Sequence, residues 1–244
     1  MRFAFLTYGL KIALATVLVL VFGSRNFVSA ADADSRNQVS PALSTLSARV
    51  VPGKVTVVQM SDLTASERLF LNPGRILKAR TPFLEQDLGD KQPNLLQRAA
   101  KIIKSHQGKP EKDAFLPSST TNPPFSDLVF LGRVPEGVGP NGTAVRITRL
   151  FAAPSGLMVM LTEWAYKLAG GGILMIREYQ NQRVRGHLAM LSLQKSTTGH
   201  AVWKLTWASG EKNYELYMED KITDDTDLSR AVERITALAT SLEE

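Results

Sequence analysis

The sequence contains no cysteine and only three histidines. Without cysteine the chain can form no disulfide bond and no thiolate metal site, and it cannot carry the cysteine-linked lipid of a lipoprotein. Its stability must therefore come from a packed core. His106, His187 and His200 are the only imidazole candidates for metal binding or neutral-pH catalysis, and they follow no motif spacing. We therefore predict no metal site and no cofactor, and the sequence identifies no catalytic residue.

Signature motifs of hydrolases and nucleotide-binding proteins are also missing. Ser155-Gly156 and Ser209-Gly210 lie in predicted turns, and no G-x-S-x-G elbow joins a strand to a helix. The run Gly170-Gly171-Gly172 precedes a predicted strand, whereas a phosphate-binding loop leads into a helix, so a hairpin turn is expected. Glu163 and Glu178 could face each other across this turn as an acid/base pair. Solvated charges on the wet face of a sheet are the alternative interpretation.

Only one long apolar run occurs, at the N-terminus. Residues 12–22 (IALATVLVLVF) follow a start with two basic residues and no acidic residue, and residues 28–30 (VSA) provide a small-residue cleavage site. The run is shorter than the roughly 20 apolar residues of a stable membrane span. We therefore expect residues 1–30 to be a signal peptide and the protein to be exported, to the periplasm or outside the cell. An uncleaved anchor over residues 3–22 is the alternative.

The net charge of +6 does not indicate a nucleic-acid partner. Three of the 29 basic residues lie within residues 1–30, so the rest of the chain carries 26 basic against 23 acidic residues. Charge is least even between residues 75 and 112, where nine basic residues accompany four acidic ones. In this stretch Arg98, Lys101 and Lys104 are candidates for contact with an anionic surface such as lipid headgroups. A solvated helix face is the alternative.

The sequence after the signal divides into three parts. Residues 31–54 are polar and small, as in a linker, and residues 55–124 form a small mixed helical region that ends in a proline-rich connection. Within that region Thr64-x-x-Glu67 predicts a capping box and a short helix, and apolar spacing predicts a second helix over residues 93–105. Residues 125–244 form the third part, which is rich in β-forming residues.

Seven strands and one helix are predicted in this last part. The strands cover residues 128–132, 144–151, 157–166, 173–179, 184–193, 201–207 and 213–218. Short turn segments separate them, so consecutive strands are expected to pair antiparallel. Leu228, Ile235 and Leu238 belong to an apolar stripe at steps of three and four residues, which predicts a C-terminal amphipathic helix. The predicted fold is α+β: an antiparallel meander of six or seven strands covered by this helix, with a smaller mixed N-terminal region.

Several spaced residues also carry a family resemblance. They are Gly186-His187-Leu188-Ala189, Leu205-Thr206-Trp207, Tyr214-Glu215-Leu216, Ile235 and Ala239-Thr240-Ser241-Leu242. With them, residues 150–243 resemble an uncharacterised C-terminal domain of exported bacterial envelope proteins, which accompanies anti-sigma-factor-like or lipoprotein-sorting-like modules. The resemblance implies an α+β envelope module without established catalytic residues.

The apolar residues of the meander suggest a binding function. A lipid or another apolar ligand could be held under the C-terminal helix by Met158, Met160, Trp164, Trp203 and Trp207. Simple core packing is the alternative for these side chains. The leading hypothesis is an exported, non-enzymatic module of the cell envelope that binds an apolar ligand or a partner protein. An envelope hydrolase with an unlocated site and a membrane-tethered structural protein are the alternatives.

Overall fold

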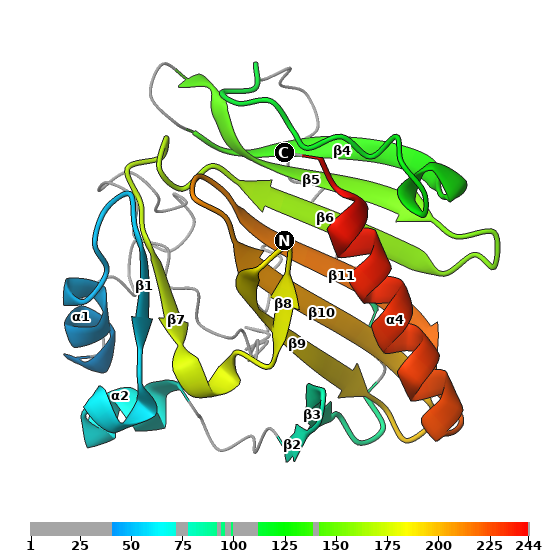
Figure 1. Cartoon of the computed structure of the whole chain (residues 1–244), viewed down its shortest axis with the longest axis horizontal. Coiled ribbons are helices and arrows are strands. Elements are labelled where there is room, and N and C mark those ends of the chain that lie inside the picture. The colour runs from blue at the N-terminus through cyan, green and yellow to red at the C-terminus, as the bar shows by residue number, and fades with distance from the viewer. Residues whose placement is uncertain are drawn as a thin grey trace, which may run out of the picture.

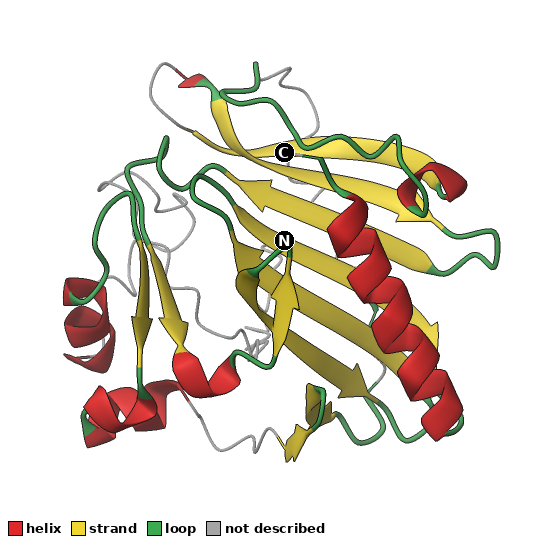
Figure 2. Cartoon of the chain, in the orientation of Figure 1, coloured by secondary structure: helices red, strands yellow, loops and turns green. Residues whose placement is uncertain are grey.

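The structure, a computed structural model, describes residues 41–71, 78–91, 94–95, 99, 112–138 and 142–243. Figure 1 and Figure 2 show one large sheet crossed by a long helix, with a smaller sheet and short helices beside it. The smaller sheet has two strands. The fold class is α+β, and the large sheet is mostly antiparallel, as the sequence predicts.

Within the described residues, nine strands make up the large sheet. In chain order they are β2 (Lys78–Arg80), β3 (Phe83–Asp87), β4 (Val129–Val138), β5 (Ala144–Ala152), β6 (Met158–Trp164), β8 (Gln182–Val184), β9 (His187–Lys195), β10 (His200–Ala208) and β11 (Asn213–Lys221). Their spatial order is β2-β3-β9-β10-β11-β6-β5-β4, and β8 pairs with β9. Only β3 and β9 run parallel; the other neighbours are antiparallel.

The sheet consists of two three-stranded meanders placed side by side. β4, β5 and β6 form one, β9, β10 and β11 form the other, and β6 pairs with β11. The expected pairing of residues 157–166 with residues 173–179 is therefore wrong. The second of these segments contains β7 (Ile173–Ile176), which instead pairs in parallel with β1 (Val55–Val58) in the two-stranded sheet.

The glycine run before β7 explains this departure. A Cβ atom on Gly172 would lie 2.3 Å from the backbone oxygen of Val51, so the absent side chain lets two backbones approach closely. The N–H of Gly53 donates to the oxygen of Gly171 at 2.7 Å at the same place. The glycines therefore allow a segment that lies more than 100 residues earlier in the chain to pack closely beside them. The tight hairpin that was predicted does not form.

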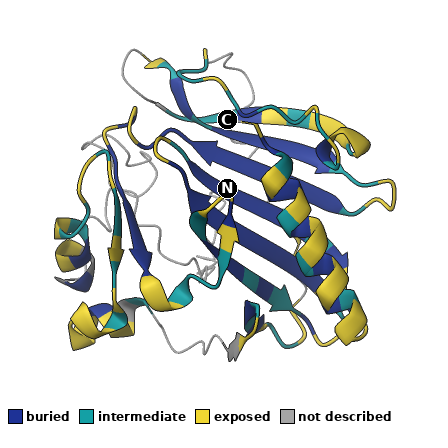
Figure 3. Cartoon of the chain, viewed as in Figure 1, coloured by how far each residue is buried: buried dark blue, intermediate teal, exposed yellow. Residues whose placement is uncertain are grey.

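Helix α4 (Asp225–Ser241) covers one face of the large sheet, called here the front face (Figure 1). The predicted apolar stripe is correct: Leu228, Ile235 and Leu238 are all buried in the core under the helix. The side chain of Asp224 caps the first turn by accepting from the N–H of Asp227 at 2.9 Å. Figure 3 shows the central strands buried, with exposed residues on the outer side of α4 and on part of β4.

The opposite face, called the back face, carries a second apolar cluster. Leu95 and Ala99 pack there with side chains from β5, β6, β10 and β11. Both residues are helical and belong to the helix predicted over residues 93–105. Residue 94 is described and is not helical, and the other residues of this range lie outside the described ones.

Short helices pack around the two-stranded sheet. They are α1 (Pro41–Ala48), η1 (Met60–Asp62) and α2 (Ala65–Leu71). Elsewhere in the described residues, 3₁₀ turns include η2 (Phe125–Asp127) and η4 (Arg177–Tyr179). The capping box at the start of α2 is confirmed, because Thr64 N donates to Glu67 Oε2 at 2.7 Å and Glu67 N donates to Thr64 Oγ1 at 3.2 Å. Helix α1 lies within the stretch expected as a linker, and its Leu46 is fully buried.

Residues 184–193, predicted as one strand, are divided by a two-residue turn. Val184 and His187 pair across it, with Arg185 (φ 48°) and Gly186 (φ 85°) at the centre. Positive φ at both central residues suits the right-handed twist of a β-hairpin. The chain therefore reverses from β8 into β9. The Nε of Arg185 donates to the carbonyl of Thr240, in the last turn of α4, at 3.1 Å.

Candidate functional site

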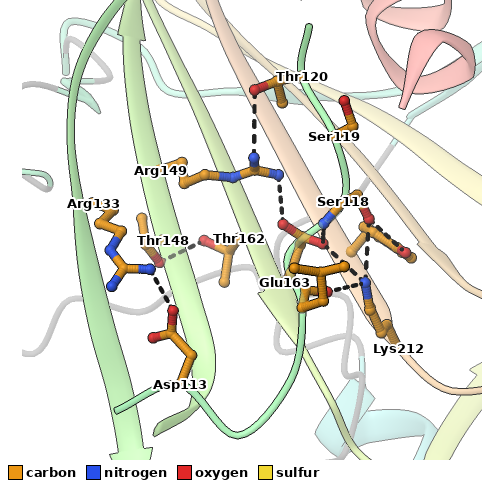
Figure 4. Close-up of polar contacts among 12 residues, drawn as sticks. Asp113, Ser118, Ser119, Thr120, Arg133, Thr148, Arg149, Thr162, Glu163 and Lys212 are labelled. Carbon is orange, nitrogen blue, oxygen red and sulfur yellow. Dashed lines mark hydrogen bonds and ion pairs between the residues drawn. The ribbon is translucent and has the colours of Figure 1, made fainter. Parts of the chain in front are cut away.

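A buried carboxylate lies at the centre of the best-connected polar cluster on the front face. Glu163, near the end of β6, is fully buried and accepts a 2.6 Å hydrogen bond from Arg149 Nη2 on β5. Its other oxygen accepts from the backbone N–H of Ser118 at 2.9 Å and lies 3.5 Å from Lys212 Nζ. One carboxylate therefore pairs with two cations and one backbone amide, as Figure 4 shows.

The cluster continues through hydroxyl groups. Ser118 Oγ lies 3.1 Å from the hydroxyl of Tyr214, and Lys212 Nζ donates to Ser118 Oγ at 3.4 Å. The same ammonium donates to the carbonyl of Leu116 at 2.9 Å. The ring of Tyr214 stacks on Trp207 with centroids 4.7 Å apart, so the polar cluster borders directly on the apolar core.

These contacts hold residues 112–121, called here the crossing segment, against the front face. Ser119 forms a β-bridge with Glu243, and the side chain of Asn122 donates to the carboxylate of Glu243 at 2.7 Å. At the other end of the segment Asp113 pairs with Arg133 of β4. The crossing segment thus connects β4, β6 and Glu243, which lies two residues beyond the end of α4. Structural anchoring is therefore the plain role of the cluster.

Serine, lysine and tyrosine side chains in contact are also a set that can activate a serine nucleophile. Here Ser118 is 2% exposed and Tyr214 is fully buried, so a substrate cannot reach the hydroxyl in this conformation. The ammonium of Lys212 also donates to a carbonyl and pairs with Glu163, which leaves it poorly placed to accept a proton from Ser118. The geometry therefore favours anchoring over catalysis.

A second ion pair lies on the back face. Lys204 Nζ donates to Glu215 Oε1 at 2.8 Å, and the hydroxyl of Tyr217 donates to Glu215 Oε2 at 3.0 Å. Burial alone would lower the pKa of Lys204, but the adjacent Glu215 outweighs it and the pKa is raised. The lysine is therefore held in its charged form. Nearby, the hydroxyls of Thr148 and Thr162 lie 2.9 Å apart across β5 and β6.

A polar cleft of about 490 Å³ opens beside η4, β8 and the start of β9. Its lining residues are Arg177, Gln180, Asn181, Gln182, Arg183 and Leu188. It carries two guanidinium groups and no acidic residue. No site was predicted at this place from the sequence, because the residues follow no known motif and belong to three separate elements.

The five predicted apolar ligand residues do not meet in one place. Met158 and Met160 pack on the back face, and Trp203 and Trp207 pack on the front face. Trp164 belongs to a third cluster, between the large and small sheets. All five are buried, and the two faces of the sheet separate them. Arg98, Lys101 and Lys104 lie outside the described residues.

The sequence suggested either an acid/base pair of Glu163 with Glu178 or a solvated charge on the sheet, and both interpretations are wrong for Glu163. This residue is buried rather than solvated, and its partners are Ser118, Arg149 and Lys212. The carboxylate of Glu178 accepts instead from the backbone N–H of Met60 at 2.9 Å. The pair was expected because a hairpin was expected between β6 and β7, and that hairpin does not form.

The two described histidines, His187 and His200, lie apart. His187 pairs with Val184 at the start of β9, whereas His200 starts β10 at the other end of the hairpin. Across the turn between β9 and β10, Lys195 pairs with Ala201. His106 lies outside the described residues. Within the described part of the chain, no three His, Asp or Glu side chains come together in a way that could hold a metal ion.

The start of β4 carries a feature that sequence reasoning missed. Val129, Phe130 and Leu131 are 60%, 55% and 52% exposed, although each is a large apolar residue in a strand. Strand β4 is the last in the order of the sheet, so its outer edge pairs with no strand among the described residues. Three consecutive apolar residues were visible in the sequence, but their position at an edge depends on the order of the strands.

We compared the chain with protein-family models, curated proteins and solved structures, and none of them matches it. Among the described helices, none has both the length and the apolar character needed to cross a membrane.

Proposed function

We propose that this chain is an exported, non-enzymatic module of the cell envelope that binds a partner protein along the free edge of β4. One observation carries the proposal: three consecutive large apolar side chains are more than half exposed at a sheet edge that pairs with no strand among the described residues. Such an edge is a template for another strand, and soluble proteins normally blunt it.

The beginning of β4 differs in this respect from the rest of the strand. From Arg133 onward the strand carries Arg133, Pro135 and Glu136, and charges and proline are the usual protection of an edge strand. The first four residues, 129–132, carry no charge. Protection there is limited to a β-bulge between Phe130 and Gly132, in which Leu131 has no register partner. The unprotected part of the edge is therefore short and apolar.

This geometry specifies the occupant as an extended strand of another protein. Backbone donors and acceptors along the edge pair with an extended chain, and the apolar side chains select apolar neighbours. Pairing of two copies is less favourable. A two-fold axis near Leu131 would place the bulges of both copies opposite each other and interrupt both ladders at the same point.

Other candidate functions have less support. The space under α4 is filled by side chains such as Trp203 and Trp207, which are buried in the front core, so an apolar ligand would have to displace them. A hydrolase based on Ser118 would need the crossing segment to leave the sheet. Export itself is supported by the apolar run and small-residue exit within residues 1–30.

A designed peptide tests the edge directly. A six-residue peptide of alternating valine and threonine should bind the protein, and a twin with N-methylated amides on one edge should not, because it cannot complete the ladder. Leu131→Asp should weaken peptide binding by more than about tenfold, equal to about 1.4 kcal/mol. Leu69→Asp is the matched control, because Leu69 is exposed on α2.

Two results would contradict this proposal. One is equal binding of the peptide and its methylated twin, and the other is equal loss of binding in both variants. Concentration-dependent dimers that dissociate in the Leu131→Asp variant would show that the edge serves a second copy instead.

A further inference from the structure

A row of apolar side chains crosses the front face of the large sheet and ends at the β4 edge. Paired residues of antiparallel strands place their side chains next to each other on one face, so the register traces rows across the sheet. One row passes from β4 through β5, β6, β11 and β10 to β9 by way of Phe130, Phe151, Val159, Met218, Trp203 and Leu193. The five inner members are buried in the front core, whereas Phe130, at the edge, is 55% exposed. The row therefore stops with its last side chain only partly covered.

The two neighbouring rows of the front face reach the edge with different chemistry. One of them ends with Arg149 of β5 beside Arg133 of β4, and the next ends with Ile147 beside Pro135. Charged residues and proline at an edge disfavour the addition of a strand. Of these three rows, only that of Phe130 presents an apolar side chain at the edge.

The ring of Phe130 is held in place by aromatic contacts within the protein. Its centroid lies 5.5 Å from that of Phe151, with the two ring planes at 59°. Phe151 also contacts Phe125 of η2, with centroids 5.2 Å apart and planes at 57°. Because these contacts position Phe130 before a partner arrives, little further ordering of its side chain is needed on binding.

We propose that the partner strand places an aromatic side chain opposite Phe130, as the next member of this row. The inference rests on the proposed function, because it names the side chain by which the β4 edge recognises its partner strand. Aromatic pairs are among the favourable cross-strand pairs of a sheet, and tilted ring contacts add to the effect of burial alone. The partner ring extends the contacts among Phe125, Phe151 and Phe130 by one ring, and it covers the side chain that is more than half exposed in the free protein.

Three peptides test the identity of the recognised side chain. Each is the six-residue peptide of alternating valine and threonine, with phenylalanine, leucine or alanine at its third position. Fluorescence anisotropy of dye-labelled peptides measures their binding to the protein. The phenylalanine peptide should bind at least about tenfold more tightly than the alanine peptide, because it buries a large apolar side chain. It should bind about threefold more tightly than the leucine peptide, because a pair of rings contributes beyond its buried area.

Two variants of the protein assign this preference to Phe130. In Phe130→Ala the phenylalanine and leucine peptides should bind equally, because the ring that distinguishes them is absent. Val129→Ala is the matched control and should keep the preference for phenylalanine. Val129 is the preceding residue of the same edge and is 60% exposed, but its side chain points to the opposite face of the sheet. Thermal melts of both variants check that each is folded.

Three results would overturn this inference and leave the β4 edge as a binding site. They are equal binding of the phenylalanine and leucine peptides to the wild type, an unchanged preference in Phe130→Ala, and a lost preference in Val129→Ala. If none of the three peptides binds, the proposed function itself fails, and the inference about Phe130 fails with it.

Discussion

Arg149 and Glu163 form an ion pair inside the protein, with Nη2 and Oε2 2.6 Å apart and with side chains 10% and 0% exposed. The two residues come from neighbouring strands, and Lys212 adds a second cation to the same carboxylate. Removing one partner of a buried pair leaves the other charged and desolvated, which costs more than the pair itself contributes.

Glu163→Ala should therefore destabilise the protein by about 3–5 kcal/mol, as measured by urea unfolding. Glu163→Gln should cost less, because its amide oxygen can still accept from Ser118 N. Limited proteolysis should cut within residues 112–121 more readily in the alanine variant. Glu233→Ala, on the exposed side of α4, should stay within about 0.5 kcal/mol of the wild type. Wild-type stability of Glu163→Ala would contradict the anchoring role.

A pH dependence is expected from Glu67. Its burial would raise the pKa, but hydrogen bonds from Arg49 and from Thr64 outweigh burial and lower the pKa to about 2. Because the folded pKa lies below the unfolded value of 4.5, this group stabilises the protein above pH 4.5 and loses its contribution as pH falls toward 2.

Glu67→Gln should thus be less stable than the wild type at pH 7, and the difference should shrink between about pH 5 and pH 2. Chemical unfolding at several pH values measures it. Glu233→Gln serves as the control and should run parallel to the wild type. A difference that stays constant down to pH 2 would show that the charge of Glu67 contributes nothing.

Gly172 should tolerate no side chain. A Cβ atom there would meet the Val51 oxygen at 2.3 Å and Val50 Cγ1 at 2.8 Å, so Gly172→Ala should lower stability by more than about 2 kcal/mol. Gly210→Ala is the matched control, because a Cβ atom on Gly210 would have nothing within 4 Å and its φ is not positive. Equal melting temperatures for the two variants would refute the close approach of the two backbones.

The proposed cleavage of residues 1–30 as a signal peptide can be tested by measuring the mass of the protein. The small-residue site at residues 28–30 predicts a mature N-terminus at Ala31, and a second such site at residues 31–33 (ADA) predicts one at Asp34. Intact-mass measurement of protein recovered from outside the cytoplasm distinguishes them. Full-length mass in the membrane fraction would instead support the anchor alternative.

Local patterns predicted the local structure well. The stripe of Leu228, Ile235 and Leu238 gave the position of α4, and the Thr64–Glu67 pair gave the start of α2. Short turns also predicted four of the antiparallel pairings in the large sheet. In each case the decisive residues lie within a few positions of one another, where sequence spacing and geometry are directly linked.

Contacts between distant segments were not predictable in the same way. Glu163, Arg149 and Lys212 come from three separate strands or turns and follow no motif, so their meeting depends on the β6–β11 pairing. The run 129–131 has the composition of any strand, and only the order of strands makes it exposed. The positions of the buried Glu163 cluster and of the exposed β4 edge therefore both follow from long-range topology.

The β6–β11 pairing also determines when the molecule can finish folding. The meander of β4, β5 and β6 is complete at Trp164, but the strand that pairs with its inner edge begins only at Asn213. Contacts of such long sequence separation form slowly. A chain that crosses a membrane in extended form, N-terminus first, would leave the edge of β6 unpaired until about 50 more residues had emerged, although every residue of this strand is buried in the finished fold. A holding chaperone would bind at β6 during that interval.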